Sequence, residues 1–442
     1  MTTLVISAFI LYALILWRVN HGSFILSPSA VHLAYLLLYV IVPVVALYAL
    51  DAPHSFGGGE TYYVGDTTLS SVLLGLVGLA VGALVTGRGT GQQASPRPDL
   101  QGRTFLGPLL LAFVLTFSFV IKNFDFISSL NSFQALGDSE HYAMVQQLKA
   151  DALYGSTYLL QGVHHIIPFM GLIFLAKYYC GEKRKYRNWA VALIVFDLGF
   201  EILSGNLWVA IAPLVMVLMV RQYFRPATKQ QMVVAGTLLV LLVVGLFVVK
   251  FGSSALENDD QDRLQLLGMV GQRMSSGAGT MQLIVETYPQ QRSYEYGLTY
   301  VRDAVSLIPS PIKREFFPES WWGGFNGYVS YELGFYKATA QVPVMAEFYA
   351  NFGMIGVLIG SVLYGMGLQH FSNYLRRHSI RTASMVVVIV VLGSRLAEAT
   401  VEGIGGRFSV TCLWISIFFV YDGLTRPGRE LAPQLDIAPA TT

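Results

Sequence analysis

Charged side chains are scarce in this sequence. Asp, Glu, Lys and Arg together make up 13% of the 442 residues, whereas soluble domains are about 25% charged. Hydrophobic residues make up 54%, and long apolar runs recur along the whole chain. This combination excludes an ordinary soluble protein and predicts a polytopic, all-α membrane protein.

Cysteine is also scarce, since the sequence contains just Cys180 and Cys412. Each lies in an apolar run or at its end, and the two provide neither a disulfide framework nor the spacing of a metal site. We therefore expect no metal and no cofactor. Basic tracts with interleaved aromatic residues are missing too, which argues against nucleic acid as a partner.

A basic region before the first apolar run is missing as well. Arg18 follows the run Thr3–Trp17 instead of preceding it, which is the reverse of a secretory signal peptide. We expect this run to be retained as the first of about eleven membrane-spanning helices, each of about 20 apolar residues or somewhat fewer. The expected spans are Thr3–Trp17, Pro28–Leu50, Thr67–Thr86, Thr104–Ile121, Leu153–Tyr179, Trp189–Leu203, Leu207–Val220, Met232–Val249, Val344–Leu368, Thr382–Leu396 and Phe408–Tyr421.

Basic residues cluster in the loops that we assign to the cytoplasm, because such loops carry an excess of Lys and Arg. This assignment places the N-terminus outside and the C-terminus in the cytoplasm. It also favours two separate crossings for the short sixth and seventh spans, which could otherwise form one broken helix. The cytoplasmic loops contain Arg88, Arg97 and Arg103; Lys183, Arg184, Lys185 and Arg187; Arg221, Arg225 and Lys229; and Arg376, Arg377 and Arg381.

The spans divide the chain into four parts. Residues 1–250 form an N-terminal bundle of about eight helices, and residues 344–422 contribute about three more. Between them, residues 251–343 are too long for a mere connector and predict a large outer (periplasmic) loop subdomain. Residues 423–442 form a cytoplasmic tail.

Aromatic side chains in the outer loop are candidates for sugar binding. The axial C–H bonds of a pyranose lie flat against an aromatic ring, so Tyr296, Tyr300, Trp321 and Trp322 could provide platforms for a glycan. The alternative for each ring is packing, or a place in the aromatic belt at the membrane interface.

Arginine side chains are candidates for binding a diphosphate, because the planar guanidinium donates two hydrogen bonds to phosphate oxygens. The alternative for an arginine of the outer loop is plain solvation. Arg395 begins the stretch RLAEATVEGIGGR and could instead pair locally with Glu398 or serve as the cation for another carboxylate. The candidates are Arg263, Arg273, Arg302, Arg395 and Arg407.

An acid and an amide begin the ninth span. Glu347 comes four residues after Pro343, where a helix N-terminus stabilises negative charge, and Asn351 lies one turn later on the same face. We expect the glycines of this span to let another helix approach closely. Ionisable groups at membrane depth indicate function, so Glu347 and Asn351 are the candidate catalytic residues; an ion pair between helices is the alternative.

These motifs together resemble a known family. The run AEFYANFGMIGVLIG (Glu347, Asn351, Phe352, Gly353 and Gly356), with the upstream YEYGLTYVRDAVSLIPSPI, resembles the bacterial oligosaccharide repeat-unit polymerases of O-antigen and capsule synthesis, the Wzy group. The segments YLLLYVIVPVVALY and SGNLWVAIAPL are similar to the same group. The likeness in general layout covers nearly the whole chain.

The resemblance implies a metal-independent glycosyltransferase of the polytopic C-type class, which works at the outer face of the cytoplasmic membrane. It would transfer a growing glycan from undecaprenyl diphosphate onto a lipid-linked repeat unit, within membrane lipids and with a chain-length regulator protein as a possible partner. Glu347 would act as the base, or would position the acceptor, and Asn351 would orient Glu347 or the sugar. A lipid-linked oligosaccharide transporter (flippase), an O-antigen ligase and a structural scaffold remain as alternatives.

Overall fold

The computed structural model describes twelve continuous stretches of the chain, together with single positions between 110 and 121 and between 228 and 231. In this part of the chain the secondary structure is helical, apart from two short antiparallel strands, β1 (His54–Ser55) and β2 (Thr61–Tyr62). The stretches are residues 1–20, 27–51, 54–55, 61–87, 165–181, 183–203, 207–225, 276–308, 310–333, 341–377, 383–405 and 407–424.

Five helical segments in the described residues are long and apolar enough to cross a membrane. They are α1 (Thr2–Val19); Pro28–Ala49, which comprises α2 (Pro28–Leu36), η1 (Leu37–Ile41) and α3 (Val42–Ala49); α4 (Asp66–Thr86); Val344–Leu375 of α16 (Val344–Arg377); and Ser384–Glu402 of α17 (Ala383–Glu402). Three shorter apolar helices are His165–Tyr179, Ala212–Phe224 and Phe408–Val420. The prediction of a helical membrane protein is confirmed in this coarser form.

The expected number of eleven spans and the orientation of the termini stay predictions. The expected span Met232–Val249 and most of Thr104–Ile121 lie outside the described residues. The short sixth and seventh spans correspond to two helices that pack against each other, α8 (Arg184–Leu203) and α9 (Leu207–Phe224).

The second apolar segment changes its helical pitch where proline requires it. Pro28 lies in the first turn, and the Ser27 side chain accepts a hydrogen bond from the Ala30 N–H, so the helix begins there. Pro43 has no N–H to donate to the preceding turn. The chain passes through the π-helical turn η1 directly before Pro43, and such a turn is a known way to accommodate an interruption in a helix.

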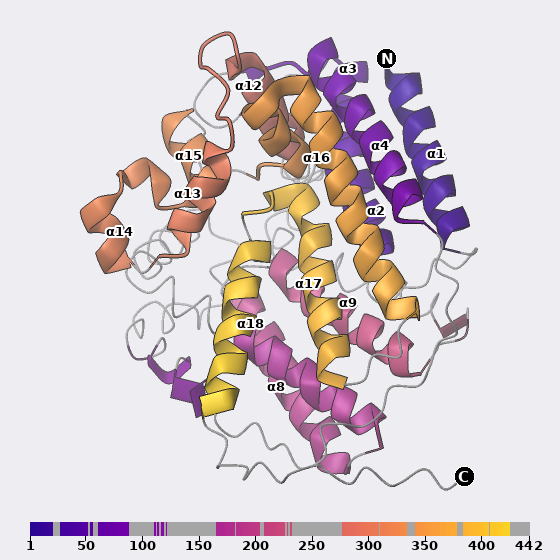
Figure 1. Cartoon of the computed structure of the whole chain (residues 1–442), viewed down its shortest axis with the longest axis vertical. Coiled ribbons are helices and arrows are strands. Elements are labelled where there is room, and N and C mark those ends of the chain that lie inside the picture. The colour runs from indigo at the N-terminus through magenta and orange to yellow at the C-terminus, as the bar shows by residue number, and fades with distance from the viewer. Residues whose placement is uncertain are drawn as a thin grey trace, which may run out of the picture.

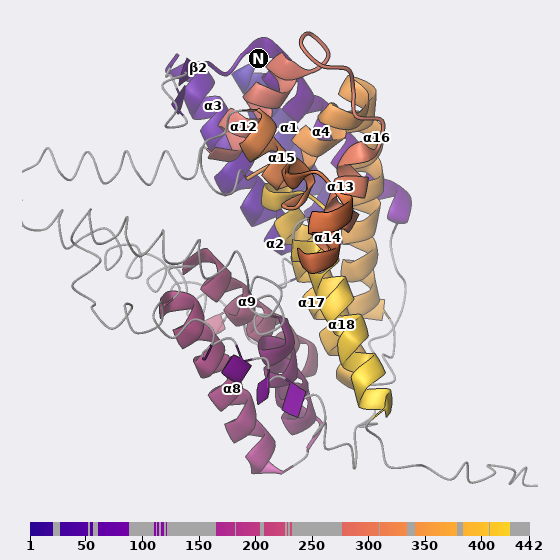
Figure 2. The ribbon, with the colours of Figure 1, turned by 90° about the vertical axis from the view of Figure 1, so that its left-hand side faces the viewer.

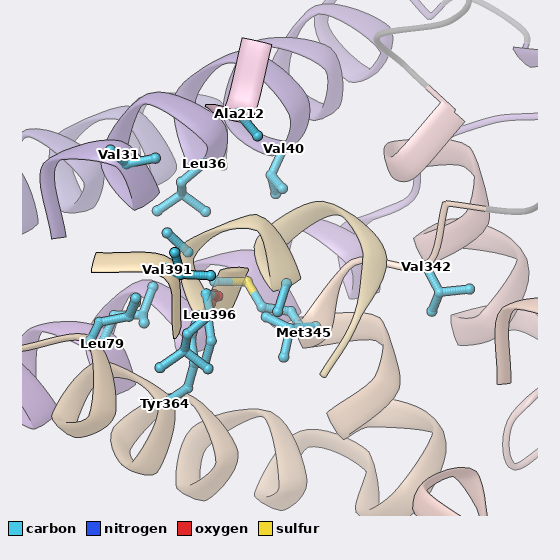
Figure 3. Packing of buried hydrophobic residues seen from close by; sticks show 14 of the residues in the cluster. Val31, Leu36, Val40, Leu79, Ala212, Val342, Met345, Tyr364, Val391 and Leu396 are labelled. Carbon is cyan, nitrogen blue, oxygen red and sulfur yellow. The ribbon is translucent and has the colours of Figure 1, made fainter. Parts of the chain in front are cut away.

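Helix α17 lies at the centre of the bundle and contacts α2, α16, α9 and α18 (Arg407–Leu424). Its stretch Val386–Leu392 is uninterruptedly apolar, as expected for a helix surrounded by other helices. Figure 3 shows Val391 and Leu396 of α17 between Leu36 of α2 on one side and Tyr364 of α16 on the other. Figure 1 shows α1, α4 and α16 side by side next to this centre.

Helices α4 and α16 approach closely along a row of glycines. A Cβ atom on Gly78 would lie 2.7 Å from the Leu358 carbonyl oxygen, and one on Gly365 would lie 2.8 Å from the Leu79 carbonyl oxygen. A Cβ atom on Gly82 would meet the backbone of α16 as well. Small residues at such contacts let two helix backbones pack tightly in a membrane.

Residues 276–333 form short helices beside the end of the bundle at which α16 begins. Figures 1 and 2 show α13, α14 and α15 grouped on one side of that end. These residues belong to the part of the chain that we expected as the outer subdomain, whose extent and side of the membrane stay predictions. The elements are α12 (Ser276–Thr287), α13 (Leu298–Ser306), α14 (Ser310–Phe316), η3 (Glu319–Trp321) and α15 (Gly324–Glu332).

The glycine contact between α4 and α16 can be tested by substitution. Gly82→Ala should lower the free energy of unfolding by about 1–3 kcal/mol, because the added methyl group forces the two backbones apart. The measurement is thermal unfolding of the purified protein in detergent. Gly199→Ala in α8 is the matched control, since its Cβ atom meets no atom within 4 Å. Equal unfolding temperatures for both variants and the wild type would contradict the close packing.

Candidate functional site

Helix α16 is broken after its second turn. Phe352 (φ −144°, ψ 16°) and Gly353 (φ 63°, ψ −149°) leave helical geometry, and the conformation of Gly353 is essentially restricted to glycine. The first turns fold back on the rest of the helix: a Cβ atom on Gly360 would lie 2.5 Å from the Phe348 ring. Twelve residues of straight helix would place these two positions about 18 Å apart.

The break changes the role of the glycines in this span. We expected them to let another helix approach, and for Gly353, Gly356 and Gly360 this prediction is wrong. Cβ atoms on Gly356 and Gly360 would meet Phe348 of the same helix, and one on Gly353 would lie 2.6 Å from the Tyr294 hydroxyl. Contact with a separate helix, α4, is made further along, at Gly365.

A turn from the preceding segment occupies the broken end of the helix. The Glu295 N–H donates to the Ala350 carbonyl (2.9 Å), and the Tyr296 N–H donates to the Asn351 carbonyl (3.2 Å). The Gly297 N–H donates to Asn351 Oδ1 (2.8 Å). These bonds satisfy carbonyl groups that the interrupted helix leaves without partners. Tyr296 takes the left-handed conformation (φ 47°) to make this turn, a strained geometry for a residue with a side chain.

Asn351 links three parts of the site. Its Nδ2 atom donates to Thr299 Oγ1 on α13 (2.6 Å) and to the Glu347 carbonyl one turn earlier (2.9 Å), while Oδ1 accepts from Gly297. The side chain is fully buried. Asn351 therefore holds the turn that carries Glu347 against α13; its expected role in catalysis stays a prediction.

Glu347 is buried to 1% exposure and points away from lipid, into protein. Its Oε2 atom accepts a hydrogen bond from the Ile404 N–H (2.9 Å), in the loop between α17 and α18. Its Oε1 atom is buried and has no hydrogen-bond donor among the described residues. We gave an ion pair between helices as the alternative role for Glu347, and among the described residues Glu347 forms no ion pair.

Asp303 of α13 faces Glu347 and was not among our predicted site residues. Both carboxyl groups pack against the same three residues, 403–405: a Cβ atom on Gly403 would lie 2.9 Å from Glu347 Oε2, and one on Gly405 would overlap the Asp303 carboxylate. Two buried carboxylates so close to each other repel, which favours one proton held by the pair. Asp303 is 7% exposed, and its Oδ1 atom accepts from the Phe325 N–H (2.8 Å). Burial raises the pKa of the Asp303 carboxyl to about 6.

Three glycine residues pack against the two carboxyl groups. A Cβ atom on Gly324 would lie 2.6 Å from Asp303 Oδ1, and one on Gly403 would lie 2.9 Å from Glu347 Oε2. A Cβ atom on Gly405 would overlap the Asp303 carboxylate. Gly324 and Gly403 also have positive φ angles, 68° and 74°. Three glycines from two loops therefore allow the backbone to approach the carboxyl pair more closely than any other residue would.

Tyr300 lies one turn before Asp303 on α13. Burial, and then the charges of Glu347 and Asp303, raise the pKa of its hydroxyl. The residue is 37% exposed. Tyr300 therefore combines partial exposure with the electrostatic influence of both acids.

Tyr296 lies at the top of a lipid-facing stripe. Its ring contacts Phe352, with centroids 6.3 Å apart, and it is 71% exposed. Below it, one face of α16 exposes Ile355, Ile359 and Leu363 at helical spacing. An exposed tyrosine above an apolar stripe is typical of the membrane interface. This position favours the belt interpretation for Tyr296.

The other two aromatic candidates, Trp321 and Trp322, make contacts inside the protein. The Trp321 ring lies 5.5 Å from the guanidinium carbon of Arg302, and Trp322 Nε1 donates to the Phe317 carbonyl (3.0 Å). Both are half-buried. Sugar binding by these rings, and by Tyr300, stays a prediction.

Arg302 forms a buried ion pair in place of an open anion site. Its guanidinium lies 2.9 Å from Glu295 Oε2, and Tyr288 donates to Glu295 Oε1 (2.6 Å). The same guanidinium stacks 3.7 Å from the Tyr328 ring centre. Binding of a diphosphate by Arg302 would require exchange of this carboxylate for phosphate.

Arg395 pairs with Glu398 (2.6 Å), and both side chains are buried. This is the local pairing that we gave as an alternative. Arg395 precedes Ile404 by nine residues, about 13 Å along a helix, so it lies well away from Glu347. Arg263 and Arg273 lie outside the described residues, as does the side chain of Arg407 at the first position of α18.

No protein-family model, curated protein or solved structure matches the chain. The case for function therefore depends on the site itself. Over the residues that the structure describes, no group of three His, Cys, Asp or Glu side chains could hold a metal ion.

The break in α16 provides a test of the site's construction. Gly353→Ala should destabilise the protein by about 1–3 kcal/mol, because alanine is strained at this backbone conformation and its methyl group would meet Tyr294. Gly327→Ala in α15 is the matched control, since its Cβ atom meets nothing within 4 Å. Thermal unfolding in detergent measures both, and a Gly353→Ala variant as stable as the control would contradict the broken helix.

Proposed function

We propose that the chain is a membrane-embedded glycosyltransferase that extends a glycan on undecaprenyl diphosphate, in the manner of the Wzy-like polymerases that its motifs resemble. The observation that carries this proposal is the carboxyl pair of Asp303 and Glu347, buried between α13, α16 and the loop after α17. The reaction takes place at the outer face of the cytoplasmic membrane of a bacterium.

The reaction needs a base. The acceptor hydroxyl attacks the anomeric carbon of the donor, a new glycosidic C–O bond forms, and the bond from that carbon to the diphosphate oxygen breaks. The hydroxyl proton passes to the carboxyl pair, and undecaprenyl diphosphate leaves as the anion. A base works best when its pKa lies near the working pH, and the raised pKa of Asp303, about 6, meets this condition.

The carboxyl pair suits this role better than a single exposed acid. With one shared proton the pair carries one negative charge, which accepts a second proton from the substrate. Tyr300, half-exposed beside the pair, provides the side from which the acceptor sugar enters. Asn351 holds the Glu347 turn against α13 through Thr299.

The leaving diphosphate needs cations. Arg263, Arg273 and Arg407 are the candidates whose side chains are not described. Arg302 and Arg395 are held by Glu295 and Glu398. We assign the diphosphate to the first group, with Arg302 able to join by exchanging Glu295 for phosphate. A ligase would use the same site and differ in its acceptor.

A transporter of lipid-linked oligosaccharide is the second candidate, and the broken helix favours it. Discontinuous helices line the binding sites of many transporters, and a buried carboxyl pair near the membrane could bind and release a transported proton. Catalysis and transport can be told apart with the protein purified in detergent. Under that condition there are no compartments to transport between, so only an enzyme would convert repeat units into polymer.

Substitution of the pair tests the catalytic proposal. Glu347→Gln and Asp303→Asn should each slow polymer formation from purified lipid-linked repeat units by about 10²–10⁴-fold, because the base is lost. Glu319→Gln, an exposed acid of the same segment, is the control and should keep the wild-type rate. Full-length polymer at the normal rate from both variants would dismiss the pair as the base. A wild-type protein that forms no polymer but moves lipid-linked oligosaccharide across a vesicle membrane would establish the transporter.

The pH dependence follows from the raised pKa of Asp303. Below about pH 6 the pair holds two protons and has no capacity for a third, so the rate should fall about tenfold for each pH unit. Above that pH the pair is singly protonated and the rate should be level. Rates measured between pH 4.5 and pH 8, with protein stability followed in parallel, test this; an acid limb centred at the ordinary pKa of aspartate, near 4, would be inconsistent with the buried pair.

A further inference from the structure

Basic and aromatic side chains from three helices meet at one end of the bundle. The helix His165–Tyr179 brings Tyr178 and Tyr179, the start of α8 brings Arg187, and Arg225 follows α9 directly. The Arg225 guanidinium carbon lies 5.9 Å from the Tyr178 ring centre and 5.4 Å from that of Tyr179, and Arg187 lies 5.9 Å from the Tyr178 ring. Arg221, one turn before Arg225, acts electrostatically on the Tyr179 hydroxyl. We refer to these five residues as the basic–aromatic cluster.

No described carboxylate forms an ion pair with the arginines of this cluster. Arg187 and Arg225 are exposed, as are Lys183, Arg184 and Lys185 next to them. The acids of α8, Asp197 and Glu201, come ten and fourteen residues after Arg187, about 15 and 21 Å along the helix.

Glu182 is the single acid near the cluster in sequence, and its side chain lies outside the described residues. Even with Glu182 counted, the six basic residues Lys183, Arg184, Lys185, Arg187, Arg221 and Arg225 leave a large positive excess at this end.

The cluster lies at the level of lipid headgroups. Directly beyond Arg187, α8 exposes Trp189, and further along it exposes Val191, Val195 and Phe196. An exposed apolar helix face in a membrane protein contacts lipid, and tryptophan is enriched where that face ends at the interface. Figure 2 shows α8 and α9 next to each other. Arg187 and Arg225 both lie 5.9 Å from the Tyr178 ring centre, so the start of α8 and the end of α9 are at the same edge of the bundle. Phospholipid phosphates occupy this level.

We propose that the basic–aromatic cluster binds the phosphate of an anionic phospholipid such as phosphatidylglycerol. The planar guanidinium groups of Arg187 and Arg225 donate paired hydrogen bonds to phosphate oxygens. The tyrosine rings beneath them hold both cations in place without neutralising their charge. This site is separate from the carboxyl pair and does not depend on the proposed glycosyl transfer.

Titration of the purified full-length protein tests the site. Native mass spectrometry in a neutral detergent measures binding of dioctanoyl phosphatidylglycerol, dioctanoyl phosphatidylcholine and inorganic phosphate. Arg187→Gln/Arg225→Gln should weaken binding of phosphatidylglycerol about 30-fold, at about 1 kcal/mol for each basic residue near anionic lipid. Arg187→Lys/Arg225→Lys keeps the charge and should lose much less. Arg314→Gln is the matched control, since Arg314 is exposed and lies 5.5 Å from the ring centre of Trp322 in the outer segment.

Tight binding of phosphatidylglycerol that the double glutamine variant loses and the Arg314→Gln variant keeps supports the proposal. Circular dichroism confirms that each variant is folded. If the double glutamine variant does not fold, the single variants Arg187→Gln and Arg225→Gln decide the matter, each with an expected loss of about fivefold. Equal binding of phosphatidylglycerol and phosphatidylcholine would overturn the proposal. Undiminished binding in the glutamine variants, or inorganic phosphate as strong as the lipid, would overturn it too.

Discussion

The backbone at the break in α16 sets the geometry of the candidate site. Backbone groups near or within a membrane must find partners inside the protein, because each unsatisfied group costs several kcal/mol. Carbonyl groups at the end of the first turns receive the N–H groups of Glu295 and Tyr296. This requirement ties the segment before α13 to α16, and it holds α13 where its acid, Asp303, meets Glu347.

The carboxyl pair is the chemical consequence of that docking. Each acid has one backbone donor, from Phe325 for Asp303 and from Ile404 for Glu347. These two backbone hydrogen bonds do not remove the repulsion between the two carboxylates, so the pair still favours one shared proton. The glycines at 324, 403 and 405 let backbone pack directly against the pair, and both acids are buried. A buried, singly charged pair suits proton transfer, whether from a sugar hydroxyl or in transport.

The sequence predicts part of this arrangement because some signals are local. An acid in an apolar run is conspicuous, so Glu347 and Asn351 could be singled out, and the three-residue spacing of Arg395 and Glu398 permits their pairing. Apolar length alone locates the five long segments. These inferences need residues within one or two helical turns of each other.

The remaining features depend on contacts between distant segments. Asp303 lies forty-four residues before Glu347 in an ordinary amphipathic stretch, and no local pattern shows that the two acids meet. Gly353 stands among glycines that also suit helix packing, so its positive φ could not be told from sequence. Tyr296 could be a sugar platform or an interfacial residue, and its contact with Phe352 and its exposure, which favour the interface, appear only in the folded structure.

Infrared spectroscopy of the carboxyl groups tests the shared proton most directly. At pH 7 the wild type should show the C=O stretch of a protonated carboxyl group, and this band should shift in heavy water. The Glu347→Gln variant should lack the band, so it should appear in the difference spectrum between the two proteins. A wild-type spectrum that shows carboxylate bands alone at this pH would mean that Asp303 and Glu347 are both ionised. That result would contradict the proton-sharing pair on which the account depends.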